Sequence, residues 1–182
     1  MQPFRLPRGG QIDRGQILRF SFDGQKYEGH PGDTLASALL ANGVRLVARS
    51  FKYHRPRGIF AAGPEEPSAL VQLETGGFTE PNRRGTDIAL YDGLRAASQH
   101  AWPRLENDLG ALIGGVAPLF PAGFYYKTFI RPRGLWRYLW EPALRHMAGL
   151  GHAPASRDPS RYDKRHTHCD VLVIGEIGRA HV

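Results

Sequence analysis

Residues 16–43, QILRFSFDGQKYEGHPGDTLASALLANG, decide the fold of the first half of this chain. Apolar and polar residues alternate up to Asp23-Gly24, a dipeptide typical of tight hairpin turns, and the alternation resumes after it. Beyond Pro31-Gly32, Asp33 precedes a run with apolar residues at helical spacing, which stops at Asn42-Gly43. The pattern predicts a β-hairpin followed by one short helix with Asp33 as its N-cap.

Two later segments have the composition of strands. They are residues 69–74, ALVQLE, and residues 87–91, DIALY, and Asp92-Gly93 follows the second. A hairpin, one helix and then more strands is the element order of a β-grasp, the architecture of two-iron two-sulfur ferredoxins. We therefore predict an α+β fold with a ferredoxin-like β-grasp domain over residues 1–95.

Residues 96–165 have a different character and are predicted to form a helical and irregular connecting segment. Within it, residues 134–149 have helical spacing, and Pro142 is expected to start a second helical piece. One face of this helix should be solvated, because it carries the charged residues Arg137, Glu141 and Arg145. The other face is expected to pack through Trp136, Trp140 and Met147.

Residues 169–175, CDVLVIG, resemble the first strand of a dinucleotide-binding βαβ unit. We predict that strand over residues 166–175, with Gly175 as the candidate cofactor-binding residue. The expected G-x-G-x-x-G turn does not follow, because Ile177 stands where a glycine is required. Residues 176–182, EIGRAHV, are what the start of a common sequencing adapter encodes, and we interpret them as adapter read-through. A natural divergent sequence is the alternative.

Composition limits the classes of protein to which the chain can belong. Its 182 residues are 41% hydrophobic and 23% charged, which is ordinary for a globular protein with one domain and part of another. A single cysteine, Cys169, excludes a disulfide framework and a four-cysteine cluster within the chain. No signal peptide or membrane span is discernible, and the single cysteine fits a reducing compartment.

The chain carries a formal net charge of +7, and part of it is concentrated in residues 45–57, which contain no acid. The five cations of this basic segment are Arg45, Arg49, Lys52, Arg55 and Arg57. Nucleic-acid binding is one interpretation, but no recognition helix or RNA motif accompanies the cations. The favoured interpretation is a basic surface that meets another subunit or an anionic cofactor, with Arg55 and Arg57 presented together.

No catalytic constellation is visible in the sequence. The histidines are scattered: they include His54, His100, His146, His152, His166 and His168. They form neither a Ser/His/Asp pattern nor an H-E-x-x-H motif. Cys169 is expected to be a small buried hydrophobe at the start of a strand. The sequence thus predicts no catalytic and no metal-binding residue.

Four motifs of the chain occur together in one known family. They are DTLASALLANG at residues 33–43, SFKYHRPRGIF at residues 50–60, FPAGFYYKTF at residues 120–129 and DKRHTHCD at residues 163–170. With them the chain resembles the N-terminal part of the alpha subunit of heterotetrameric sarcosine oxidase. In related amine-oxidising flavoenzymes the G-I-F motif opens a cysteine loop that holds a two-iron two-sulfur cluster. The corresponding positions here are Ala61, Glu66, Ala69 and Thr86, so the resemblance implies a domain without a cluster. Glu66 is expected to be a solvated surface carboxylate.

The resemblance implies a cytoplasmic, flavin-dependent oxidoreductase that demethylates sarcosine to glycine. Oxygen is the acceptor, hydrogen peroxide a product and tetrahydrofolate the recipient of the one-carbon unit. NAD, FMN and FAD are implied for the complete heterotetramer of alpha, beta, gamma and delta subunits, and none of them for residues 1–175 alone. An opine or cyanogenic glycine dehydrogenase subunit is one alternative, and a free-standing basic binding module is the other.

Overall fold

A computed structural model describes residues 2–112 and 134–172 of the chain. A hairpin and a helix come first: β1 (Leu18–Phe22), β2 (Gln25–Gly29) and α1 (Leu35–Ala41). Short strands follow, interrupted by one 3-10 turn: β3 (Ala48–Arg49), β4 (Pro56–Arg57), β5 (Leu70–Leu73), η1 (Gly76–Phe78), β6 (Glu80–Arg84) and β7 (Arg95–Ser98). The later helical elements are η3 (Trp136–Trp140) and α3 (Glu141–Met147).

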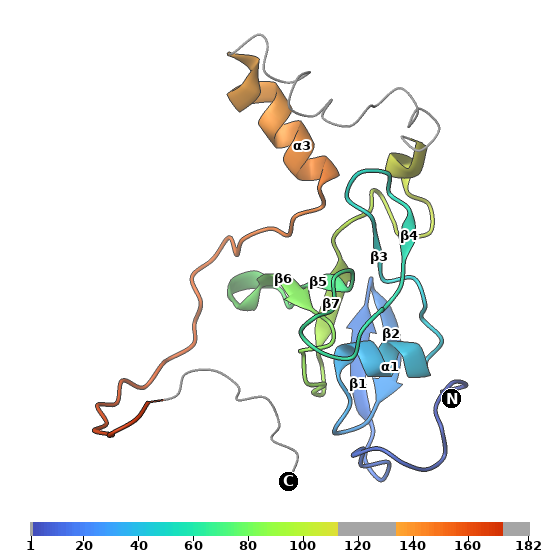
Figure 1. The fold of residues 1–182 in the computed structure, drawn as a ribbon, viewed down its shortest axis with the longest axis vertical. Coiled ribbons are helices and arrows are strands. Elements are labelled where there is room, and N and C mark those ends of the chain that lie inside the picture. The colour runs from blue at the N-terminus through green and yellow to red at the C-terminus, as the bar shows by residue number, and fades with distance from the viewer. Residues whose placement is uncertain (1, 113–133, 173–182) are drawn as a thin grey trace.

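The main sheet is mixed and has the strand order β2-β1-β7-β5-β6. Strand β1 is antiparallel to β2 and parallel to β7, and β5 is antiparallel to both of its neighbours. Helix α1 lies across this sheet near β1 and β2, while β3 and β4 form a separate small hairpin (Figure 1). Since β7 ends at Ser98, the sheet continues past residue 95, where the sequence places the domain boundary.

The predicted hairpin is confirmed. Strands β1 and β2 pair in a register that sets Phe22 opposite Gln25. The two turn residues, Asp23 and Gly24, have φ angles of 49° and 79°. Positive φ at both positions is what a two-residue turn between twisted strands requires, and Asp-Gly is a favoured pair for it.

The predicted helix also forms, but its N-cap is Thr34 and not Asp33. The Thr34 side chain accepts a hydrogen bond from the backbone N–H of Ser37, and the Ser37 hydroxyl oxygen accepts one from the Thr34 N–H. This reciprocal pair is a capping box. The helix ends at Asn42, and Gly43 adopts a φ angle of +83°.

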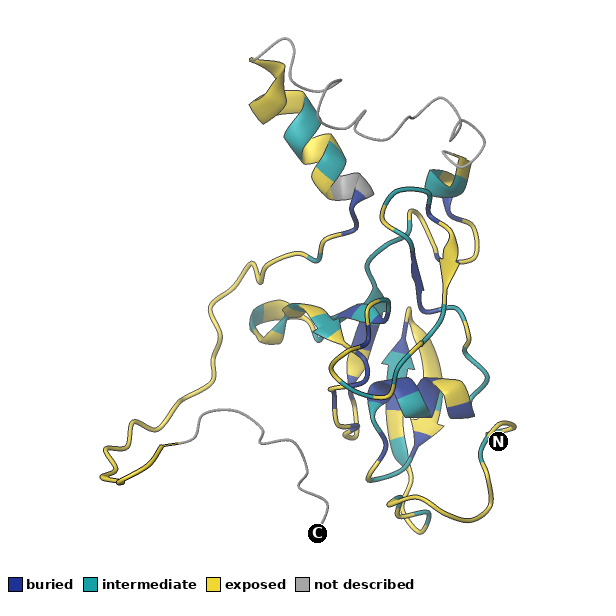
Figure 2. Cartoon of the chain, viewed as in Figure 1, coloured by how far each residue is buried: buried dark blue, intermediate teal, exposed yellow. Residues whose placement is uncertain are grey.

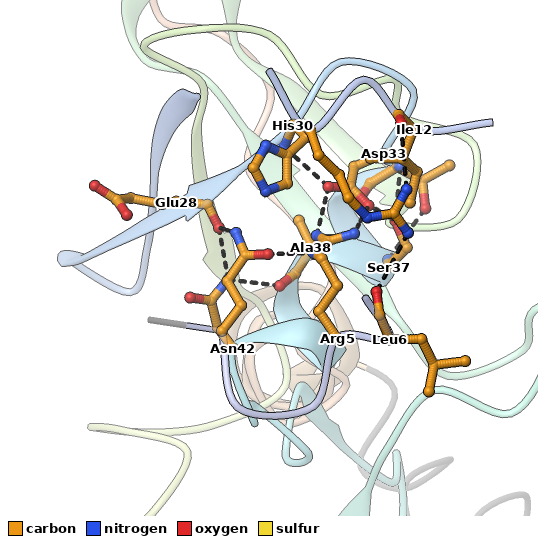
Figure 3. Close-up of polar contacts among 12 residues, drawn as sticks. Arg5, Leu6, Ile12, Glu28, His30, Asp33, Ser37, Ala38 and Asn42 are labelled. Atoms are coloured by element: carbon orange, nitrogen blue, oxygen red, sulfur yellow. Dashed lines mark hydrogen bonds and ion pairs between the residues drawn. The ribbon is translucent and has the colours of Figure 1, made fainter. Parts of the chain in front are cut away.

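Asp33 instead anchors the N-terminal arm of the chain. Its carboxylate accepts hydrogen bonds from Arg5 at 2.6 and 3.1 Å, from the Ser37 hydroxyl at 2.7 Å and from the His30 backbone N–H at 2.9 Å (Figure 3). Burial alone raises the pKa of Asp33, but these donors outweigh burial and hold the pKa below its ordinary value. The arm that contains Arg5 is thereby tied to the start of α1.

A hydrophobic core lies between the sheet and α1 (Figure 2). Its buried members come from the hairpin, the helix and the strands after them, and they include Phe20, Phe22, Leu35, Leu39, Val71 and Leu94. Leu105 also belongs to this core and is 2% exposed, although it follows the last strand. The folded unit therefore includes residues that the sequence assigns to the connecting segment.

One predicted strand is wrong. The sequence predicts a strand at residues 87–91, but there the structure has one isolated bridge, between Thr34 and Ala89. Ile88 and Leu90 are buried as a strand would bury them, yet their backbone groups bond to the start of α1: Leu35 N–H to the Ile88 carbonyl, and Leu90 N–H to the Asp33 carbonyl. Because α1 takes these bonds, the sheet is completed by β6 and β7.

The helical prediction for residues 134–149 is confirmed in two pieces, since η3 is followed at Glu141 by α3. An ion pair joins Arg145 to Glu141 on an exposed face. The expected aromatic packing is not found for Trp136, which is 42% exposed. Within the described residues, no helix is long and apolar enough to cross a membrane.

The structure describes only part of the predicted dinucleotide-binding strand. Residues 169–172 form no strand, and Cys169, which the sequence places in a buried position, is exposed. No neighbouring strand pairs with these residues in the described part of the chain. Gly175 lies outside the described residues, as do residues 120–129 of the resemblance.

Candidate functional site

The loop between β4 and β5 is the candidate site because its spacing is that of a cluster-binding loop. Plant-type two-iron two-sulfur ferredoxins use C-x4-C-x2-C and a later fourth cysteine. Ala61, Glu66 and Ala69 have this spacing, and the residue assigned to the fourth position is Thr86. The structure places Ala61, Glu66 and Ala69 in this loop, and Thr86, which follows β6, contacts the loop at Gly63.

Glu66 is the centre of the loop. Its side chain is buried, and the residue is only 1% exposed. One carboxylate oxygen accepts hydrogen bonds from the N–H groups of Phe60 at 2.7 Å and Ala61 at 2.6 Å. The other accepts from Ser68 at 2.8 Å and Ala69 at 3.1 Å. The sequence-based expectation of a solvated surface carboxylate is wrong, because local backbone donors satisfy both oxygens. We call these four N–H groups the amide cradle.

The amide cradle also sets the charge state of Glu66. Burial alone raises the pKa of the Glu66 carboxyl, but hydrogen bonds from the backbone of Ala61, Ser68, Phe60 and Ala69 outweigh burial and hold the pKa below its ordinary value. The charged form is favoured because all four donors point at it. The loop therefore encloses an anion at neutral pH.

Thr86 closes the loop from the other side. Its hydroxyl donates a 2.8 Å hydrogen bond to the Gly63 carbonyl, and the neighbouring Gly85 N–H donates to the Ala69 carbonyl at 2.8 Å. The Gly85 carbonyl in turn accepts from Ala36 in the first turn of α1. The loop, the turn before residue 87 and the helix are thus one connected structure.

These residues do not fit an iron–sulfur cluster. A cluster of this type is held by cysteine thiolates, and the chain's single cysteine, Cys169, is exposed and far along the sequence. Ala61 and Ala69 have no donor atom, and Glu66 already uses both oxygens within the chain. Among the described residues, no group of three or more His, Cys, Asp or Glu is placed to hold a metal ion.

A second buried polar cluster joins the β3–β4 hairpin to the segment after β7. The Asp108 carboxylate accepts a 2.7 Å hydrogen bond from His54 Nδ1 and lies 3.5 Å from Arg49 Nε. The Arg49 guanidinium donates to the Leu105 carbonyl at 2.7 Å and to the His54 carbonyl at 2.9 Å. Asp108 also accepts from the N–H groups of Trp102 and Gly110. This cluster, Arg49-His54-Asp108, packs the two segments together.

Sequence reasoning missed the Arg49-His54-Asp108 cluster. His54 and Asp108 are 54 positions apart, and no motif links them. The sequence carries no signal of it, and only the structure shows that His54 has a positive φ of 51° and that a Cβ at Gly110 would overlap the His54 ring. A positive φ is uncommon for a residue other than glycine, although histidine tolerates it better than most, and the hydrogen bond to Asp108 fixes the His54 side chain in this conformation.

The basic segment is only partly a surface feature. Arg49 is 9% exposed and belongs to the cluster with Asp108. Arg45 stacks on the Phe4 ring at 5.0 Å, and Arg55 stacks on Tyr53 at 5.1 Å. Arg55 and Arg57 are both exposed, as the sequence predicts. The exposed basic surface of this segment therefore includes fewer than its five cations, because Arg49 is buried.

The remaining histidines do not converge on a site in the described residues. His166 and His168 lie on an exposed segment. His100 lies near His54; burial, and then the proximity of His54, lower the pKa of His100. Neither arrangement includes a nucleophile among the described residues.

Residues 15–101 match the profile of a family described as the 2Fe-2S iron-sulfur cluster binding domain. Sarcosine oxidase subunit alpha of Rhizobium meliloti (strain 1021) is 57% identical over 175 residues, covering 96% of this chain and 18% of that protein. The chain is a homologue of the N-terminal part of sarcosine oxidase alpha subunits. It spans about a fifth of their length or less.

Two other sarcosine oxidase alpha subunits extend the comparison. That of Corynebacterium sp. (strain P-1) is 35% identical over 94% of this chain and 14% of its own length. That of Corynebacterium sp. (strain U-96) is 31% identical over 92% of this chain and 13% of its own length. Among solved structures, an L-proline dehydrogenase from P. horikoshii superposes with a TM-score of 0.43 at 26% identity, over 59% of this chain and 20% of that one.

Proposed function

We propose that this chain is part of the alpha subunit of an oxidoreductase that demethylates sarcosine to glycine. The observation that carries the proposal is the 57% identity to a sarcosine oxidase alpha subunit over 96% of the chain. The reaction uses flavin, passes electrons to oxygen to give hydrogen peroxide, and transfers the one-carbon unit to tetrahydrofolate. Beta, gamma and delta subunits are the proposed partners, and the cytoplasm is the proposed location.

Within this enzyme the segment acts as a structural β-grasp domain that transfers no electrons. The Glu66 carboxylate fills the loop that would hold a cluster, and Ala61 and Ala69 offer no thiolate. NAD, FMN and FAD are then held outside the β-grasp domain, and Gly175 is the candidate dinucleotide-binding residue in this sequence. The domain serves the enzyme by packing against its neighbours.

The test is to co-express the complete alpha-subunit gene with its partner genes and to measure sarcosine-dependent oxygen uptake and iron content. We expect hydrogen peroxide formation with sarcosine and no iron bound to this domain. Turnover of an opine or of glycine in place of sarcosine, with stoichiometric iron, would overturn the proposal and favour the dehydrogenase alternative.

Arg55 and Arg57 are the candidate residues for contact with another subunit or an anionic cofactor. Both are exposed, and paired guanidinium groups suit bidentate contacts with carboxylates or phosphates. Changing both to alanine in the complete alpha subunit should weaken assembly or cofactor retention, as measured by size-exclusion chromatography and flavin content. Normal assembly, cofactor content and turnover would mean that the segment is only a solvated loop.

A further inference from the structure

We propose that residues 60–69 form a binding site for a carboxylate-sized anion, and that the chain fills this site with its own Glu66. The site is the amide cradle, which matches the spacing of a cluster loop but holds no cluster ligands. The inference concerns the fold of the domain and does not depend on the activity of the complete enzyme.

The geometry is that of an anion site. The cradle donors come from two short stretches, Phe60-Ala61 and Ser68-Ala69, that converge on one buried group. Converging backbone N–H groups form concavities that bind anions, including phosphates and iron–sulfur clusters. The sulfurs of a cluster accept hydrogen bonds, and a carboxylate accepts them as well. An internal carboxylate can therefore take the place of a bound anionic group.

The number of N–H donors in the cradle fits the two acceptor oxygens of a carboxylate and does not fit the neutral amide of a glutamine. Glu66 offers two acceptor oxygens, and each takes two donors of the cradle. A glutamine has one acceptor oxygen and an NH2 group that would face two N–H donors. A buried N–H left without an acceptor destabilises the folded state. The cradle is therefore expected to select for charge as well as for shape.

The experiment uses the full 182-residue chain and its variants Glu66→Gln and Glu66→Ala, with Glu65→Gln as the matched control because Glu65 is exposed. Urea unfolding should show an unfolding constant larger by about tenfold for each Glu66 variant, because each variant loses hydrogen bonds to a charged group. The control should unfold like the original chain. Glu66 variants that unfold like the control would overturn the proposal.

Adding formate tests the site directly. Formate carries the same carboxylate without a side chain, so it should stabilise Glu66→Ala in a saturable manner and leave the original chain and Glu65→Gln unaffected. Sodium chloride at equal ionic strength is the reference. A formate effect that is absent, or equal in all proteins, would overturn the proposal.

A measurement on the unchanged chain keeps the test valid should Glu66→Ala fail to fold. Backbone amides of Ala61 and Ala69 should be protected from hydrogen exchange at neutral pH, since both donate to a buried carboxylate. Exchange of these two amides at the rate of exposed loop residues would contradict the structure of the cradle and overturn the proposal.

Discussion

Glu66 and Asp108 are both buried carboxylates, yet they are satisfied in different ways. Glu66 takes all its donors from backbone groups within six residues of itself. Asp108 relies on side chains from a distant hairpin, His54 and Arg49, and on two backbone donors near itself. The first arrangement closes a loop, whereas the second joins segments that are far apart in sequence. Removing either carboxylate should therefore have consequences of different kinds.

The largest loss of stability is expected for Asp108→Ala. This change leaves the Arg49 guanidinium buried without its counter-ion, and breaking a buried ion pair costs about 3–5 kcal/mol. The loss is measured as the difference in the free energy of unfolding, obtained by urea titration, between the variant and the original chain. Glu106→Ala, which removes an exposed carboxylate two residues away, is the control and should change little. Equal effects of the two changes would contradict the role given to Asp108.

A smaller loss is expected for Arg5→Ala. Asp33 would then keep only its local donors, as Glu66 does, and the N-terminal arm would lose its ion pair with Asp33 while the Phe4 N–H still donates to the Ala41 carbonyl in α1. We expect a cost of about 1.5–3 kcal/mol, the range for hydrogen bonds to a charged group. Thermal or urea unfolding is the measurement, with the exposed Arg8→Ala as the control. A variant as stable as the control would show that the Arg5–Asp33 ion pair contributes nothing to stability.

The free energy of unfolding should depend on pH in one range through the carboxylates and in another range through His100. The folded-state pKa values of Glu66 and Asp33 lie below their ordinary values of 4.5 and 3.8, so their contribution is present above those values and is lost as pH falls through the folded pKa values. The folded pKa of His100 lies below 6.5, so stability already declines just below pH 6.5. Asp23 acts in the opposite sense, because burial raises its pKa.

Urea unfolding across pH 3 to 8 should therefore distinguish the contribution of Glu66 from that of His100. Glu66→Gln should flatten the acid limb, and His100→Asn should flatten the decline just below pH 6.5, because each removes a group whose proton binding differs between the folded and unfolded states. If both substitutions left the profile unchanged in shape, these two groups would not be responsible for it.

The smallest effect on stability is expected from deleting residues 169–182. Val171 and Leu172 are 78% and 71% exposed, so the described part of this tail contributes no burial to the core. The urea midpoint should stay the same, while solubility should improve because an exposed, strand-prone apolar run is removed. A lower midpoint, or unchanged or poorer solubility, would count against this view.

Sequence by itself determined the local elements and the likeness to sarcosine oxidase alpha subunits. The turn at Asp23-Gly24, the end of α1 at Asn42-Gly43 and the helical piece that begins at Glu141 follow from side chains and backbone preferences within a few residues. The same holds for the absence of thiolates at positions 61, 66 and 69, which can be seen in the sequence. Such features depend on short-range physics.

Only the tertiary structure decided where the polar groups find their partners. Asp33 is a good N-cap by type, but a distant Arg5 competes for it and Thr34 takes the cap. Ile88 and Leu90 have strand character, but α1 takes their backbone bonds. Glu66 is a charged residue in a loop, and only the folding of residues 60–69 around it makes burial favourable. Burial and hydrogen bonding depend on which segments meet in space, and local preferences do not contain that information.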